Sequence, residues 1–475
     1  MSVQTFHELY VVSDLHLGGK PGFQIFRQGD TLANFIRMCG QPSDRKIGVV
    51  FNGDIVDFLA EAPAAYLDPE GAIAKLERIF YEDAAFSGVW SALQEFVAQP
   101  NRQFILVLGN HDVELALPHV TEWIREKLSQ GDSAARGRVT TCFDGAGFPC
   151  KVGNKSVFCI HGNDVDIWNM VNHKQLLDVS FAINTNEPPP DWEPNAGTRM
   201  VIDVMNAVKR KYPIVDLLKP EVEAVVPILM TLDPGSLTEI SKILVVAAKL
   251  SMDILRTSFE GMPPEEEMVE GPAFEKKVME EFFNKYFEYD ETESMDTKEE
   301  ELEALGAFAF IPAFFSNKEN RVEKLRKALK ENLESDQSFV ITEKDKMFKE
   351  MKKKIGSKIN YLITGHSHKE RAIARKAPDC YYFNSGTWIR LIRLTEDVLG
   401  NSEEFARVYA AFESGSMEQL DAINDLGPSH DQPLVMLKPT VVSIVEKDGE
   451  TYGELRHANP DGSLKPAENT RLPGK

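Results

Sequence analysis

LYVVSDLHLGG, residues 9–19, is a short apolar run that ends abruptly in Ser, Asp and His. The apolar part predicts a buried strand, because a strand covered on both faces shows a continuous apolar run. At an extended strand end, residues i and i+2 point the same way, so the side chains of Asp14 and His16 are expected to converge. One such pair is weak evidence for a site, and its meaning depends on whether the pattern recurs.

Four more apolar runs along the chain end in polar clusters. They are IGVVF before Asn52, FILVL before Gly109, VFCI before His161 and YLIT before Gly365. The segments TLANFIRMC and WSALQEFVAQ, which have a helical period, separate the first three runs, so the sequence predicts a βαβ rhythm and a sheet covered by helices. Functional residues of such sheets gather where the strands end.

Residues suited to metal or phosphate chemistry follow all five runs. The glycines among them permit tight turns and close approach of the backbone. Together the motifs supply carboxylates, imidazoles and an amide, the mixed donor set that suits Mn, Fe or Zn. A carboxylate such as Asp54 can bridge two cations, and ions about 4 Å apart can clamp the attacking and leaving oxygens of phosphoryl transfer. The motifs are Asp14-Leu-His16, Gly53-Asp54-Ile-Val-Asp57, Gly109-Asn110-His111-Asp112, His161-Gly162 and Gly365-His366-Ser-His368.

In this order the motifs resemble the calcineurin-like metallophosphoesterase superfamily, whose pattern is DxH, GDxxD, GNH(D/E), a later H and GHxH. The resemblance implies an α/β fold, a four-layer metallophosphoesterase-type β-sandwich flanked by helices, here with a large, mainly helical insertion. It implies hydrolysis of a phosphate monoester, diester or pyrophosphate by a hydroxide that bridges two divalent metal ions. By motif position, the implied ligands are Asp14, His16, Asp54 and His368 for one metal and Asp54, Asn110, His161 and His366 for the other.

Three further residues of these motifs receive roles beyond metal binding. The resemblance implies that His111 contacts the phosphate and protonates the leaving oxygen, with electrostatic stabilisation as the alternative. Asp112 is interpreted as a catalytic residue that orients His111, and Asp57 as an acceptor behind the metal ligands. The alternative for either aspartate is to cap the helix that follows it.

A second phosphatase pattern occurs in the segment Cys39-Gly-Gln-Pro-Ser-Asp-Arg45, which has the CxxxxxR spacing of cysteine phosphatases. We interpret it as a coincidence, because it follows a helical pattern instead of a strand. Pro42 would remove an amide donor, and Asp44 would add negative charge where phosphate should bind.

The organisation of the chain changes after the fourth motif. Residues 1–164 and 356–457 are predicted to form the catalytic domain, residues 165–355 a helical insertion that acts as a cap or interaction module, and residues 458–475 a loose tail. Amphipathic segments of the insertion, such as SKILVVAAKLSMDIL, are expected to pack their own core, with a substrate pocket or a dimer interface as alternatives.

Two charged segments and one turn add detail. Residues 263–303 are strongly acidic and are expected to form a solvated helix face or a partly disordered loop. The Lys-rich segment KDKMFKEMKKKIGSK is expected to be a solvated helix face and not a substrate-facing patch. Asp448 and Gly449 lie between alternating segments and predict a β-hairpin.

The composition limits the partners and the compartment. The net charge of -21 argues against nucleic acid as the main partner, whereas a phosphorylated small molecule is compatible with it, because bound metals reverse the local charge. Five scattered cysteines and an amino terminus without secretory features predict a cytoplasmic protein. The stretch GAFAFIPAFF at 306–315 is shorter than the roughly 20 residues of a spanning helix. Peripheral membrane contact and homo-oligomer formation stay open.

The motifs of this chain differ from those of several phosphoesterase subfamilies, and these differences narrow the range of expected substrates. Serine/threonine protein phosphatases carry GDxVDRG and GNHE, whereas this chain has GDIVDF and GNHD, which disfavours that activity. SDLHLGG and GDxxDF are similar to bacterial small-molecule phosphoesterases, including the UDP-diacylglucosamine pyrophosphate hydrolases, although His111 replaces the usual Arg of that enzyme. The expected substrate is therefore a small-molecule, nucleotide-like or lipid-linked phosphoester. The alternatives are an SbcD-like nuclease and a protein-interaction scaffold with an auxiliary phosphoesterase site.

Overall fold

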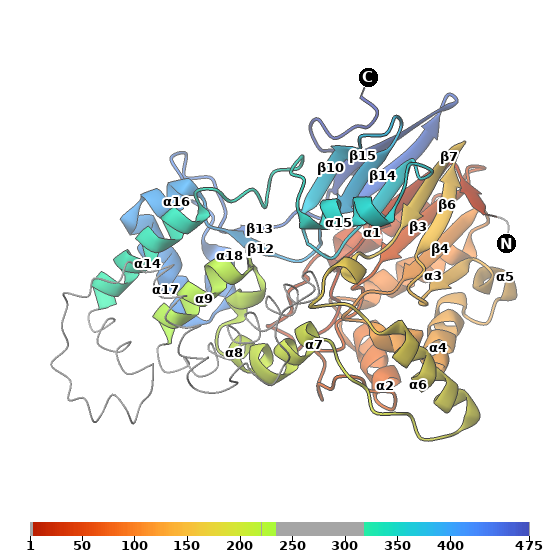
Figure 1. Ribbon diagram of the computed structural model, residues 1–475, viewed down its shortest axis with the longest axis horizontal. Coiled ribbons are helices and arrows are strands. Elements are labelled where there is room, and N and C mark those ends of the chain that lie inside the picture. Colours follow the sequence, from red (N-terminus) through yellow and green to blue (C-terminus); the bar gives the residue numbers. More distant parts are fainter. Residues whose placement is uncertain (1–2, 220, 234–317, 475) are drawn as a thin grey trace, which may run out of the picture. The chain divides into compact units, whose positions relative to one another are not determined.

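The computed structural model describes two compact units of the chain. The first unit comprises Met1–Ile202, Gln337–Arg390 and Leu437–Lys475, and the second comprises Asp203–Asp336 and Leu391–Met436. Within these ranges the described residues are 3–219, 221–233 and 318–474 (Figure 1).

Two mixed β-sheets build the first unit. The six-stranded sheet has the order β1 (Gln4–Phe6), β6 (Phe148–Val152), β7 (Lys155–Cys159), β9 (Tyr361–Thr364), β11 (Tyr381–Ser385) and β10 (Glu370–Ala374). The seven-stranded sheet has the order β16 (Leu464–Pro466), β15 (Glu450–Ala458), β14 (Thr440–Lys447), β2 (Glu8–Val12), β3 (Ile47–Asn52), β4 (Arg102–Val107) and β5 (Val139–Cys142). Strands β2 to β5 run parallel, and so do the neighbours β7, β9 and β11.

The apolar runs of the central strands are buried because both faces of the sheet are covered. Leu9 and Val11 of β2 contribute to the core between the two sheets. Their neighbours Tyr10 and Val12 point the other way, into the core between the sheet and the helices. This period of two accounts for the continuous apolar run, since neither face of the strand meets water.

Helices cover the outer face of each sheet and complete four layers (Figure 1). The seven-stranded sheet packs against α1 (Gly29–Gly40), α3 (Ser87–Ala98) and α4 (Pro118–Ser129), whose apolar sides share its outer core. The six-stranded sheet is covered by α15 (Lys346–Lys354). The α/β sandwich with flanking helices that the sequence predicts is confirmed. The remaining helices of this unit are α2 (Ala72–Glu77), α5 (Ser133–Arg136), α6 (His173–Thr185) and α7 (Ala196–Met200).

Helix α15 contains most of the Lys-rich segment. Met347, Phe348 and Met351 are buried against the six-stranded sheet, whereas the lysines near the end of the helix are exposed. The expectation of a solvated helix face is confirmed. The predicted hairpin is confirmed as well: Asp448 and Gly449 connect β14 to β15 with φ values of 55° and 82°, as a tight turn requires.

The unit boundaries differ from the predicted domain boundaries. Helix α6 and α15 pack on the first unit, because their apolar faces complete its two outer cores. Residues 391–436 belong to the second unit, because β12 (Leu391–Arg393) pairs with β8 (Leu218–Lys219). The expectation of a loose tail from residue 458 is not met: β16 pairs with β15, and Gly453 and Leu472 exchange two backbone hydrogen bonds of 2.7 Å.

The second unit contains a three-stranded sheet, with the strand order β13 (Val435–Met436), β12 and β8, and several α-helices. These helices are α8 (Asn206–Lys209), α9 (Glu221–Leu232), α14 (Lys318–Leu333), α16 (Glu396–Gly400), α17 (Ser402–Ser414) and α18 (Met417–Ala422). Among the described residues, no helix has the length and apolar content needed to cross a membrane. The predictions for SKILVVAAKLSMDIL, for residues 263–303 and for the 306–315 stretch lie outside the described residues.

Candidate active site

The five predicted motifs follow β2, β3, β4, β7 and β9, and the structure brings them together. Strands β2, β3 and β4 are parallel neighbours in one sheet, and β7 and β9 are parallel neighbours in the other, so the carboxyl ends of each set meet at one edge. Hydrogen bonds between side chains and backbone link the two sheets at this edge. Asn52 Nδ2 donates to Ile160 O at 3.0 Å, and the Asp14 carboxylate accepts the His366 amide at 3.0 Å.

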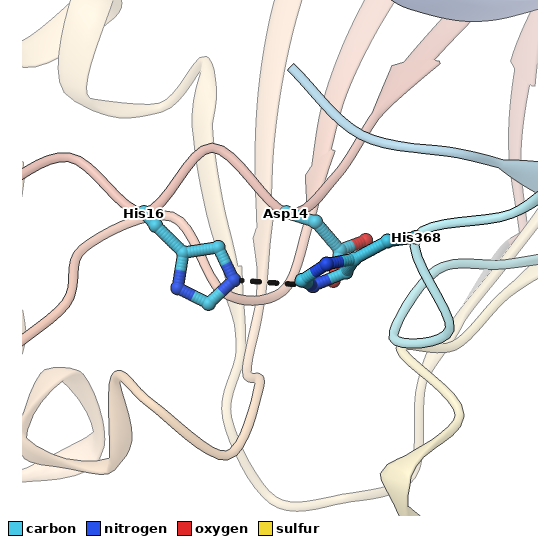
Figure 2. Close-up of side chains that lie close together, drawn as sticks. All are labelled: Asp14, His16 and His368. Carbon is cyan, nitrogen blue, oxygen red and sulfur yellow. Dashed lines mark hydrogen bonds and ion pairs between the residues drawn. The ribbon is translucent and has the colours of Figure 1, made fainter. Parts of the chain in front are cut away.

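The first group of side chains consists of Asp14, His16 and His368 (Figure 2). His368 Nε2 lies 3.3 Å from Asp14 Oδ1 and 3.3 Å from His16 Nε2. Asp14 is completely buried and accepts a short hydrogen bond from the Ser13 hydroxyl. Two imidazole nitrogens and a carboxylate oxygen therefore point at one another from two distant segments of the chain.

The second group consists of Asp54, His161 and His366. Asp54 Oδ2 lies 3.2 Å from His161 Nε2, and His161 Nδ1 lies 2.8 Å from the Asn52 carbonyl oxygen. The carbonyl fixes the imidazole, since only a protonated Nδ1 can donate to it, and Nε2 then faces the carboxylate. Asp54 Oδ1 accepts the amides of Asn110 and His111, both at 2.9 Å.

A third group joins His111 to the first group through Asp57. Asp57 Oδ1 lies 3.4 Å from His111 Nδ1, and Asp57 Oδ2 lies 3.4 Å from His16 Nδ1. The His111 side chain is 19% exposed, whereas that of His16 is 4% exposed. Asp57 thus lies behind both imidazoles, and His111 is the more open of the two to a molecule entering from solvent.

The backbone is strained at five of the predicted metal ligands. Positive φ values are rare for residues other than glycine and cost about 1–3 kcal/mol each, so they persist where the surrounding structure imposes them. Such outliers gather at functional sites. The φ values are 53° at Asp14, 47° at His16, 51° at Asp54, 66° at His366 and 58° at His368.

Close approach explains the glycines of two motifs. A Cβ at Gly109 would lie 2.2 Å from Asp54 N and from Asp54 Oδ1. A Cβ at Gly365 would lie 2.5 Å from Ser13 Oγ and 2.7 Å from an Asp14 carboxylate oxygen. Side chains at these two positions would displace the carboxylates that the sequence predicts as ligands.

The electrostatics of the site favour cations. Burial would raise the pKa of Asp54, but the positive charge of His161 and of neighbouring histidines outweighs it and lowers this pKa well below its usual range. Burial would lower the pKa of His161, but the Asp54 carboxylate outweighs it and raises this pKa to about 10. Two carboxylates, those of Asp14 and Asp54, are therefore charged and buried, a state that needs positive partners.

The donor set also fits metal ions. Asn110 Oδ1 is buried and has no hydrogen-bond partner among the residues that the structure describes. A buried amide oxygen without a donor is costly unless another positive group meets it. Together with carboxylates and imidazoles, this oxygen belongs to the donor set of divalent transition-metal ions.

The Asp112 carboxylate is directed at backbone amides, whereas its predicted role is to orient the His111 imidazole. Its carboxylate is completely buried and accepts the amides of Ile55 and Gly109, both at 2.7 Å. Burial and the negative charge of Asp54 raise the pKa of Asp112 to about 7. The residue connects the loops after β3 and β4, and the carboxylate beside the His111 imidazole is that of Asp57.

Other polar residues contact the predicted ligands or the residues next to them. The Ser385 hydroxyl lies 2.6 Å from the Ser13 hydroxyl, and the Thr387 hydroxyl donates to the Asp14 carbonyl at 2.8 Å. These contacts place the segment after β11 next to the first group. Asp166 and Asn169 contact two predicted ligands, and the only signal for them was their position shortly after the His161 motif.

The segment from Cys39 to Arg45, which has the spacing of cysteine phosphatases, is not arranged as a phosphate-binding loop. Cys39 is buried in α1, and burial raises the pKa of its thiol. The Arg45 guanidinium instead contacts the Glu8 carboxylate at 2.6 Å. A protonated thiol inside a helix cannot act as a nucleophile.

Comparison with known proteins agrees with this geometry. Residues 7–204 match the family model of the calcineurin-like phosphoesterases, whereas no curated protein matches the chain significantly. The matched segment contains the first four motifs, and the structure adds His366 and His368 to them from beyond it. Residues 7–204 therefore form a calcineurin-like phosphoesterase domain, and the family of that domain consists of metal-dependent hydrolases.

Proposed function

We propose that the enzyme binds two divalent cations and hydrolyses the phosphoester of a small molecule. The observation that carries this proposal is the place of Asp54 Oδ2, which lies 3.8 Å from His16 Nε2 and 3.2 Å from His161 Nε2. One carboxylate oxygen thus faces an imidazole from each ligand group. We assign Asp14, His16, Asp54 and His368 to one cation and Asp54, Asn110, His161 and His366 to the other.

Mn, Fe or Zn ions suit these donors. When bound, such a pair supplies a nucleophile from water at neutral pH and neutralises phosphoryl charge. Asp54 Oδ1 accepts the amides of Asn110 and His111, so Oδ2 would be the oxygen available to hold the cations. The same two hydrogen bonds hold the loop after β4 against the Asp54 carboxylate.

His111 is the residue to which we assign contact with the phosphate and protonation of the leaving oxygen. Its Nδ1 lies 3.4 Å from Asp57 Oδ1, so the negative carboxylate stabilises the protonated imidazole. With Nδ1 turned to Asp57, the transferred proton is assigned to Nε2. Asp57 takes the orienting role that the sequence interpretation gave to Asp112, whose carboxylate is directed at backbone amides.

Charge and motif details support a small-molecule substrate, nucleotide-like or lipid-linked. The net charge of -21 disfavours a nucleic-acid backbone as the main partner. The GDIVDF and GNHD motifs lack the arginine and glutamate of protein phosphatases. We propose that the second unit selects the substrate, because its larger part, Asp203–Asp336, is inserted in the chain between the segments that carry His161 and His366.

The test is turnover of p-nitrophenyl phosphate and bis-p-nitrophenyl phosphate by metal-stripped protein, with Mn²⁺, Zn²⁺ or Mg²⁺ added back. Asp54→Ala should lower kcat/KM by more than about 100-fold, because it removes a ligand and not merely an outer-shell residue. Asp178→Ala is the matched control, since this side chain is 51% exposed on α6 and pairs with Lys174. The preferred ester sets the substrate class.

Two outcomes would overturn the proposal. Retention of metal without turnover of any ester would favour the interaction scaffold. Cleavage of duplex DNA in preference to both esters would favour the nuclease.

A further inference from the structure

The loop at residues 162–169 follows the His161 motif and contacts two predicted metal ligands on other strand ends. Asp166 Oδ2 lies 2.9 Å from His366 Nε2. Asn169 Oδ1 accepts from Asn110 Nδ2 at 3.5 Å. His366 follows β9 and Asn110 follows β4, so one loop contacts ligands that come from both sheets.

Each contact orients a ligand atom toward the cation. An imidazole whose Nε2 donates to Asp166 presents the lone pair of Nδ1 on its opposite side. An amide whose Nδ2 donates to Asn169 presents Oδ1 on its other side, and Asn110 Oδ1 is the buried oxygen without a hydrogen-bond donor among the described residues. The loop thus selects the donor atom of both ligands.

Hydrogen bonds within the loop also connect Asp166 to Asn169. Asn169 Nδ2 donates to Asp166 Oδ2 at 2.8 Å, and the Trp168 amide donates to Asp166 Oδ1 at 3.2 Å. Asn163 Nδ2 donates to the Asn169 carbonyl at 3.1 Å. These hydrogen bonds hold the Asp166 and Asn169 side chains in place, which is the property that a positioning element needs.

Helix α7 supports the loop from behind. The Gly197 amide donates to the Trp168 carbonyl at 2.8 Å. A Cβ at residue 197 would lie 2.1 Å from Asn169 Oδ1, so the Asn169 side chain occupies the space that the glycine leaves. An alanine at this position would push Asn169 away from Asn110.

We propose that Asp166 and Asn169 are positioning residues for the second cation, the one assigned to Asp54, Asn110, His161 and His366. The inference rests on the proposed dimetal function. Residues of this kind contribute about 10–100-fold to metal affinity or activity. Asp166 and Asn169 contact His366 and Asn110, which are assigned to the second cation alone, so the affinity for the first cation should not change.

The experiment is titration of metal-stripped protein with Co²⁺, followed by equilibrium dialysis and by the visible absorption spectrum. Asp166→Ala should weaken one of two binding steps by about 10–100-fold and alter the absorption of that step alone. Asp166→Asn keeps an acceptor oxygen but loses the charge, so it should recover part of the affinity. Gly197→Ala should weaken the same step without changing any polar side chain.

The matched control is Asp164→Ala, which removes an aspartate of the same loop that faces His173 at 3.5 Å. Its two binding steps should equal those of the wild type. Two steps of wild-type affinity in Asp166→Ala would overturn the inference. So would equal weakening of both steps together with a lowered Tm of the metal-free protein, because that would show a merely structural role. Fewer than two Co²⁺ per wild-type chain would instead refute the dimetal function itself.

Discussion

The substitution Gly109→Ala tests whether the site requires close packing of the loop after β4 against the loop after β3. The new Cβ would lie 2.2 Å from Asp54 N and Oδ1, whereas an ordinary contact begins at 3.4 Å, so one loop must move by about 1 Å. A displacement of about 1 Å at a reacting centre costs on the order of 100-fold in rate. Overpacking costs about 1–3 kcal/mol, which a domain of about 5–15 kcal/mol stability survives.

We therefore expect Gly109→Ala to fold, to lose part of its bound metal and to show kcat/KM lowered by about 100-fold. Activity on p-nitrophenyl phosphate, metal content and urea unfolding would be measured together. Gly88→Ala in α3 is the control, because its Cβ meets Ala33 only at 4.0 Å. Activity of Gly109→Ala within threefold of wild type, with full metal content, would refute the reasoning.

Three further predictions concern other parts of the first unit. Asp57→Asn should lower kcat/KM by about 10–100-fold, because it weakens the carboxylate contacts of two imidazoles, and unchanged kinetics would contradict this role. Phe348→Ala should lower the free energy of unfolding by about 3 kcal/mol, since the ring is 5% exposed, and denaturant titration would measure the loss while kcat stays constant. Cys39→Ala should leave turnover unchanged in a steady-state assay, whereas loss of activity in folded protein would revive the cysteine mechanism.

The motifs at the strand ends were predictable because their chemistry is local. Each metal-binding motif directly follows its own apolar run, and parallel pairing then brings the ends together without further information. Both faces of β2 are buried, so the apolar run was continuous and marked the strand. That Asp54 and His161 lie at neighbouring strand ends of different sheets is shown only by the structure.

Features that depend on long-range pairing were not predictable. The final residues are rich in Pro, Gly and Asn, yet β16 pairs with β15, because hydrogen bonds to an existing strand override weak local propensity. The pairing of β12 with β8 assigns residues 391–436 to the second unit, and no local pattern announces it. Both cases show tertiary contacts deciding the state of a segment.

The supporting residues of the site escaped prediction for a related reason. Asp112 lies next to His111 in sequence, but its carboxylate turns to the amides of Ile55 and Gly109. Adjacent residues at a tight turn point in different directions, so proximity in sequence does not give contact. Asp166 contacts His366 only because the loop that carries it folds back over the site.

The most direct test of the dimetal account is a crystal structure of the protein grown with Mn²⁺, with anomalous differences collected at the manganese absorption edge. The account predicts two anomalous peaks about 3.5–4 Å apart, with Asp54 contacting both. It also predicts His368 at one peak and His161 at the other. A single peak, or two peaks that do not share Asp54, would contradict it.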